Sequence, residues 1–168
     1  MSKQYGATLA VALILLLIIS ILAIGSVQVS HMQEKMSANL QDKEMSFRAA
    51  ESALNAGEGW LLAQTRQPAI AANCQTSPCV RQFYNNTNLS SQTASWWSSN
   101  SVAYGSQLRN VATAPRYIIE YLQFVPDSPE LGNYKAGGGV HYYRITARGV
   151  GANNETVSIL QTTVARRF

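Results

Sequence analysis

Charged residues, cysteine and histidine are all scarce in this chain. Asp, Glu, Lys and Arg make up only 13% of its 168 residues, and there are two cysteines and two histidines. The formal net charge of +4, without a polybasic run, gives little support to nucleic-acid binding. His31 and His141 are far apart in sequence and form no Ser-His-Asp or metal-binding pattern. We therefore expect no catalytic site, no metal and no cofactor.

Ionisable residues are absent from residues 7–29. A bilayer's hydrocarbon core is crossed by about 20 apolar residues, whereas the apolar part of a signal peptide has about 7 to 15. The run is therefore predicted to anchor the chain in a membrane. Lys3 and the amino terminus favour the cytoplasmic side for the start of the chain and the outside for the long remainder. A signal peptide cleaved at the small residues 23–25 is the alternative.

Proline is absent until Pro68, and helical periodicity continues well beyond the apolar run. The pattern predicts one helix from about Thr8 to about Gln64, whose first half is apolar all round and whose second half is amphipathic. We expect the amphipathic half to pack on the rest of the chain. The apolar positions at helical spacing are Met32, Met36, Leu40, Phe47, Ala50, Leu54 and Leu61.

Cys74 and Cys79 are separated by four residues, which differs from the C-x-x-C spacing of redox sites and zinc knuckles. In an exported protein they would close a small loop, with Pro78 helping the chain to turn. We predict a structural disulfide. Two free thiols, or metal ligands, remain as alternatives.

Residues 65–114 are polar and irregular in pattern, and they include an Asn-, Ser- and Thr-rich segment around Trp96 and Trp97. One interpretation is a surface connection whose tryptophans pack on the domain. The other is an exposed aromatic contact for a partner, since long structured loops often carry function.

Strand patterns dominate the rest of the chain. Residues 116–125, 140–150 and 155–168 are rich in β-branched and aromatic residues, and a tight turn joins the last two as an antiparallel hairpin. One long helix followed by such strands predicts an α+β fold, in which the helix packs on an antiparallel β-sheet.

Both ends of the chain resemble a known family. Residues 32–61, "MQEKMSANLQDKEMSFRAAESALNAGEGWL", and the ending "YRITARG…VSILQTTVARRF" resemble PilX-type minor pilins of type IV pili. The resemblance implies a pilin-like fold with a leader peptide at 1–6, a transmembrane and assembly segment at 7–29 and a periplasmic domain at 30–168. It also implies cleavage by prepilin peptidase after Gly6 and N-methylation of Ala7.

One position departs from the family pattern. The fifth mature residue of major pilins is glutamate, and here that position holds Val11. Valine avoids burying a carboxylate in hydrocarbon but cannot pair with a neighbour's terminal ammonium. This departure favours a specialised subunit, such as one at the filament tip, over an ordinary subunit of the shaft.

The resemblance implies a non-enzymatic role in the initiation and assembly of a type IV pilus, supporting adhesion or twitching motility. The implied partners are other minor pilins, the major pilin and a PilY-type tip adhesin, and the protein would move from the bacterial inner membrane to the pilus. A pseudopilin of a type II secretion system is the close alternative. An anchored periplasmic enzyme and a DNA-binding competence pilin are weaker ones; the latter would use Arg144, Arg148, Arg166 and Arg167.

Overall fold

The computed structural model describes residues 7–72, 74–83, 88–106, 108–127 and 138–168. The chain divides after Gln41 into two compact units. We call residues 7–41 the stem and residues 42–168 the head.

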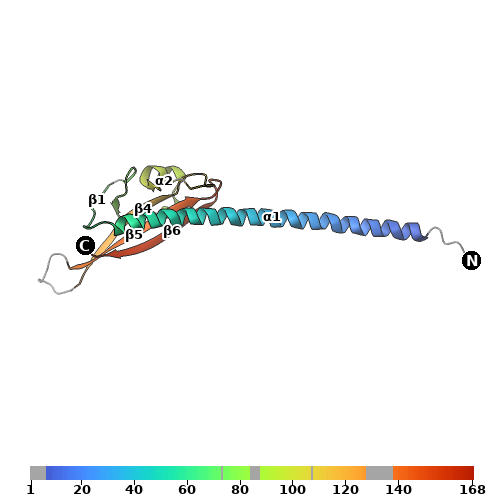
Figure 1. Cartoon of the computed structure of the whole chain (residues 1–168), viewed down its shortest axis with the longest axis horizontal. Coiled ribbons are helices and arrows are strands. Elements are labelled where there is room, and N and C mark those ends of the chain that lie inside the picture. Colours follow the sequence, from blue (N-terminus) through green and yellow to red (C-terminus); the bar gives the residue numbers. More distant parts are fainter. Residues whose placement is uncertain (1–6, 73, 84–87, 107, 128–137) are drawn as a thin grey trace, which may run out of the picture. The chain divides into compact units, whose positions relative to one another are not determined.

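A single helix, α1 (Ala7–Leu62), runs through the stem and into the head (Figure 1). Its sequence has no proline and is rich in alanine, leucine and charged residues that favour helix. The helix ends where Ala63 N donates to Gly59 O at 3.1 Å and the Gln64 side chain donates to Trp60 O at 3.0 Å. The predicted helix is thus confirmed to within about two residues at its C-terminal end.

The part of α1 inside the head packs through small residues. Ser46, Ala50 and Ala53 are completely buried, and Gly57 is buried as well. A Cβ added at Gly149 of the sheet would collide with the backbone of Ser46 and Ala50, so helix and sheet approach each other closely here.

The predicted buried face of α1 is therefore partly wrong. Phe47 is 47% exposed, and Met32, Met36 and Leu40 in the stem are 65–71% exposed. Ala50 and Leu61 are buried as expected, and Leu54 is partly buried against the core. The close helix–sheet approach selects the small residues, and it leaves the bulky side chains at the flank.

The head contains one mixed sheet in the order β1-β2-β4-β5-β6, with β3 also paired to β4. The β3–β4, β4–β5 and β5–β6 pairs are antiparallel, which confirms the predicted hairpin. Three short strands that the sequence did not predict also join the sheet: β1 and β2 pair in parallel, β2 pairs in parallel with β4, and β3 pairs antiparallel with β4. The strands are β1 (Ile70–Ala71), β2 (Val80–Gln82), β3 (Val102–Ala103), β4 (Arg116–Pro126), β5 (Gly139–Val150) and β6 (Val157–Arg166).

The main core lies between α1 and the sheet. Alternate residues of β4 and β5 point toward the helix, as expected for strands. The buried members of this core from the sheet include Val80, Tyr117, Ile119, Tyr143, Ile145 and Ala147.

The other side of the sheet is partly covered by residues 89–100. This segment contains a short 3-10 helix (Leu89–Ser91) and α2 (Ala94–Asn100), which the sequence predicted as irregular. Trp97 is completely buried and packs with Leu89 and Ile118. Of the two interpretations of the tryptophans, packing on the domain is therefore correct for Trp97.

Candidate assembly segment and head surfaces

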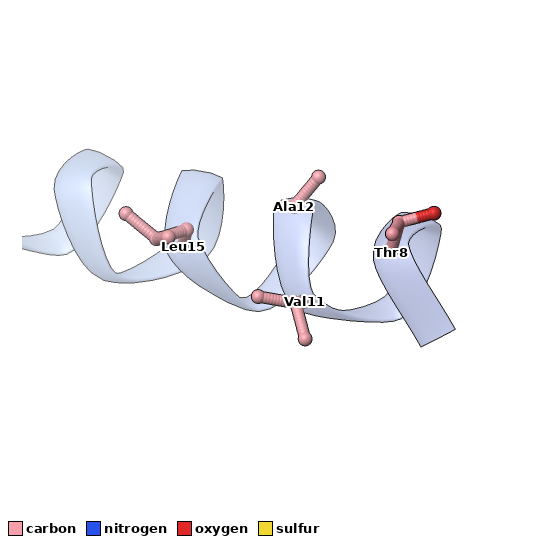
Figure 2. A pocket seen from close by; sticks show the side chains of 4 residues that line it. All are labelled: Thr8, Val11, Ala12 and Leu15. Atoms are coloured by element: carbon pink, nitrogen blue, oxygen red, sulfur yellow. The ribbon is translucent and has the colours of Figure 1, made fainter. Parts of the chain in front are cut away.

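The amino-terminal turns of α1 carry the positions that the family resemblance singles out. Figure 2 shows Thr8, Val11, Ala12 and Leu15 on successive turns, where they line an open apolar hollow on the helix surface. All four side chains come from one helix, so they enclose nothing by themselves. Val11 is 58% exposed, and no ionisable side chain occurs between Ala7 and Ser30.

The large apolar side chains of residues 9–29 are exposed all round the helix, each by 49–75% of its surface. Two serines in this stretch and the one that follows it bond back to the helix itself: Ser20 Oγ donates to Leu16 O, Ser26 Oγ to Ala23 O and Ser30 Oγ to Ser26 O. A hydroxyl satisfied in this way can enter hydrocarbon at little cost. By length and composition α1 can cross a membrane.

The proposed processing site is only partly covered by the structure. Gly6 lies outside the described residues, and Ala7 is the first residue of α1. Cleavage at Gly6 and methylation of Ala7 therefore remain predictions.

Cys74 and Cys79 form a disulfide, as predicted, with their Cα atoms 5.6 Å apart. Cys74 is 4% exposed and belongs to the main core. The bond closes the connection between the parallel strands β1 and β2, whose residues Ala71 and Arg81 are paired. Parallel neighbours normally need a crossover of about a dozen residues or more. The disulfide therefore stabilises an unusually short connection between two parallel strands.

The basic residues of the sheet are engaged within the head. Arg144 donates to the Glu120 carboxylate at 2.7 and 3.0 Å. The centre of the Phe83 ring lies 4.2 Å from the guanidinium carbon of Arg144. Glu120 is 2% exposed, so this ion pair is largely shielded from water. Arg167 pairs with Asp127 at 2.6 Å, and this hydrogen bond lowers the pKa of the Asp127 carboxyl.

The other two of the four arginines considered for DNA binding are Arg166 and Arg148. Arg166 donates to Gln64 O at 2.8 Å, and burial lowers the pKa of Arg148. Three of the four arginines that a DNA-binding pilin would use, Arg144, Arg166 and Arg167, thus have hydrogen-bond partners within the head.

The two histidines lie in different units. His31 in the stem is 3.9 Å from Glu34, both exposed. His141 on β5 lies 3.3 Å from the Tyr121 hydroxyl, and burial lowers its pKa. Within the described ranges no three His, Cys, Asp or Glu side chains gather as metal ligands.

Sequence reasoning missed the polar contacts that join α1 to the β5–β6 hairpin. The Asp42 carboxylate accepts a hydrogen bond from Ala152 N, and Lys43 Nζ donates to Val157 O at 2.6 Å. The hydroxyls of Ser46 and Ser158 lie 2.7 Å apart in a buried position. Asp42 and Lys43 lie between the apolar positions of the predicted amphipathic half of the helix. A charged residue on a helix carries no local signal that a distant backbone group is its partner.

Comparison with known protein families gives two matches. The family described as PilX N-terminal matches residues 6–55, and the family described as type IV pilus assembly protein PilX C-term matches residues 62–166. No curated protein and no solved structure matches the chain.

Proposed function

The chain belongs to the PilX family of type IV pilus assembly proteins, and we propose that this minor pilin helps to start filament growth and is retained at the filament tip. The observation that carries the proposal is the apolar Val11 within a stem whose large apolar side chains are exposed.

The proposal begins with processing. Prepilin peptidase removes residues 1–6 after Gly6, and Ala7 becomes the methylated first residue of the mature chain. Residues 7–29 then hold the subunit in the inner membrane, with residues 30–168 in the periplasm. The exposed apolar side chains of residues 9–29 support this division, since hydrocarbon is the environment that such a surface needs.

Assembly exchanges lipid contacts for contacts with other stems. A bundle of apolar stems offers the same kind of surroundings as the bilayer, so extraction exposes little apolar surface to water. Other minor pilins and the major pilin are the proposed partners of the stem. A PilY-type adhesin is the proposed partner of the head, in support of adhesion or twitching motility.

Val11 is the reason for placing this subunit at the tip. Burial of a carboxylate at that depth in the membrane costs about 2 kcal/mol or more unless a cation pairs with it. A subunit in the shaft can pair such a carboxylate with the terminal ammonium of a neighbour, whereas the leading subunit has no neighbour ahead. Valine at this position suits the leading subunit.

Substitution of Val11 tests the tip position. Val11→Glu, as the only copy in piliated cells, is expected to give equal or fewer filaments than wild type, because the added carboxyl finds no partner. Val11→Gln serves as the control for polarity without charge. The measurements are the amount of the protein in sheared filaments relative to the major subunit, and its position by immunogold labelling. A clear rise in that amount, with label along the shaft, would overturn the tip position while leaving the minor-pilin role intact.

Substitution of Gly6 tests the processing step separately. Gly6→Val should leave the leader attached and the protein in the membrane, whereas mass spectrometry of wild type should find a chain that begins at methylated Ala7. A mature chain that begins at Ser26 would show an ordinary signal peptide, and the proposed storage in the membrane would then be wrong.

A further inference from the structure

The strand β6 ends the sheet and has one open side. It pairs with β5 over its full length, from Val157 to Arg166, and no described strand lies on its other side. Natural proteins usually protect such an edge with a lysine, a proline, a bulge or a covering segment. Residues 157–165, "VSILQTTVA", contain no charge and no proline, and their pairing with β5 shows no bulge.

The hydrogen-bond register identifies the open backbone groups. Gly151 N donates to Thr156 O at 2.9 Å, so every second pair from this point, starting with Gly149 and Ser158, is a hydrogen-bonded pair. The residues of β6 that lie between these hydrogen-bonded pairs therefore point their N–H and C=O groups away from β5. The first of them, Val157, confirms this geometry because its carbonyl accepts the bond from Lys43. The remaining outward residues are Ile159, Gln161, Thr163 and Ala165.

One flank of α1 lies beside this edge. Lys43 reaches the first outward carbonyl of β6, and Phe47 lies one turn further along the same side of the helix. Phe47 is a large apolar residue, the one phenylalanine of α1, and yet 47% of its surface is exposed. Leu54, two turns beyond Phe47, is partly buried. The edge of β6 and this apolar flank form two sides of an open corner.

We propose that this corner receives one extended strand from another protein. The strand would pair with the outward backbone groups of Ile159, Gln161, Thr163 and Ala165, extending the sheet, as in recognition by strand addition. Its residues on the helix side are apolar and contact Phe47, and those on the opposite side are polar, beside Gln161 and Thr163.

A second copy of this chain does not fit the corner. Two β6 edges paired antiparallel about a two-fold axis would continue the sheet but reverse α1. The Asp42 ends of the two helices would then face opposite directions, although both continue into stems that require one membrane. The other edge of the same sheet offers only the two residues of β1, Ile70 and Ala71, which are too few for stable pairing.

The test uses the full chain in detergent and a defined probe, a short synthetic peptide of alternating valine and threonine. A control peptide has the same sequence but carries an N-methyl group on every residue, so that neither of its edges can donate to the ladder. We expect the first peptide to slow amide hydrogen exchange about tenfold or more at Ile159, Gln161, Thr163 and Ala165. The inward amides of β6 should already be protected in the free protein. Equal protection by both peptides, or no protection by either, would refute the proposal.

Two pairs of variants locate the binding. Thr163→Pro removes an outward N–H without removing a bond to β5, and should weaken peptide binding at least about tenfold, whereas Thr163→Ala should stay within about twofold. Phe47→Ser should weaken binding and Phe47→Leu should largely restore it. The Phe47 pair leaves the edge untouched, so it remains decisive even where the proline variant fails to fold. Binding that is unaffected in Phe47→Ser and equal in the two Thr163 variants would overturn the assignment.

Sedimentation of the full chain without peptide tests the alternative occupant. The proposal expects Thr163→Pro to leave the association state unchanged. A dimer of the wild-type chain that Thr163→Pro dissociates would identify a second copy as the occupant, and would contradict the proposal.

Discussion

The two halves of α1 have the same backbone structure and opposite surroundings. In the stem, large apolar side chains are exposed around the whole helix. In the head, the buried face consists mainly of serine, alanine and glycine, and the largest apolar side chain before the last turns, Phe47, is half exposed. The stem therefore depends on an apolar medium or on other stems, while the head depends on how closely the helix and the sheet fit.

This difference separates two kinds of sensitivity to mutation. A change in the stem alters what the helix can contact outside the chain, and it should have little effect on folding of the head. A change at the helix–sheet interface alters the fit directly, since close-packed interiors cannot absorb added volume without strain.

The largest effect is expected where helix and sheet lie closest. Gly149→Val places side-chain atoms against the backbone of Ser46 and Ala50, and we expect it to destabilise the head by about 3 kcal/mol or more, or to prevent folding. Gly25→Val is the control, because a Cβ at Gly25 meets nothing within 4 Å. Urea unfolding of the full chain in detergent, followed by tryptophan fluorescence, measures both. Equal stabilities would show that the interface is looser than its geometry indicates.

A comparison of two ion pairs should give the next largest difference. Glu120→Ala leaves Arg144, whose side chain is only 20% exposed, without its carboxylate, and should cost about 3 kcal/mol of unfolding free energy. Glu44→Ala removes an exposed pair with Arg48 on α1 and should change the same quantity by about 0.5 kcal/mol or less. A similar cost for the two variants would mean that the Glu120 pair is effectively solvated.

The disulfide should contribute less than the buried ion pair. Cys74→Ala combined with Cys79→Ala opens a loop that spans a sequence separation of five, and the chain-entropy model gives about 2 kcal/mol for so short a loop. The same unfolding experiment measures the loss, and wild type with reductant should approach the double variant. A loss larger than that of Glu120→Ala would show that the β1–β2 connection organises the whole head.

The smallest effect concerns Asp42 and pH. Hydrogen bonds from the Thr156 side chain and from Ala152 N lower the pKa of Asp42 below its usual value of 3.8. The folded state thus prefers the carboxylate, so this contribution is present above the unfolded pKa and is lost as pH falls through the lowered folded value. Asp42→Asn should flatten the dependence of the melting temperature on pH below about pH 4. Glu34→Gln in the stem is the control, and an identical flattening there would contradict the assignment to Asp42.

Local patterns in the chain were sufficient to predict several elements. The absence of proline and the continued helical spacing predicted α1, and the β-branched alternation with a polar turn predicted the β5–β6 hairpin. The disulfide followed from spacing and an exported context. These features depend on neighbours a few residues apart, which is why a single sequence reveals them.

Other features depended on residues far apart in the chain. Glycine at position 149 predicts nothing alone, yet with Ser46 and Ala50 it decides that α1 buries its small residues and leaves Phe47 at the flank. Glu120 and Arg144, the anchoring of Asp42 and Lys43 on the β5–β6 hairpin, and the open edge of β6 are likewise set by strand order and register.

The sequence by itself determined that residues 7–29 need an apolar medium, that one helix continues from them into a folded domain, and that this domain ends in an antiparallel hairpin. Each of these follows from side-chain chemistry repeated at a fixed local period. Only the tertiary structure decided which face of α1 is buried, which charges are paired and which strand edge stays open. Those outcomes depend on the fit between segments that are distant along the chain, such as those of Ser46 and Ser158, whose sequence separation is 112, and no local period encodes that fit.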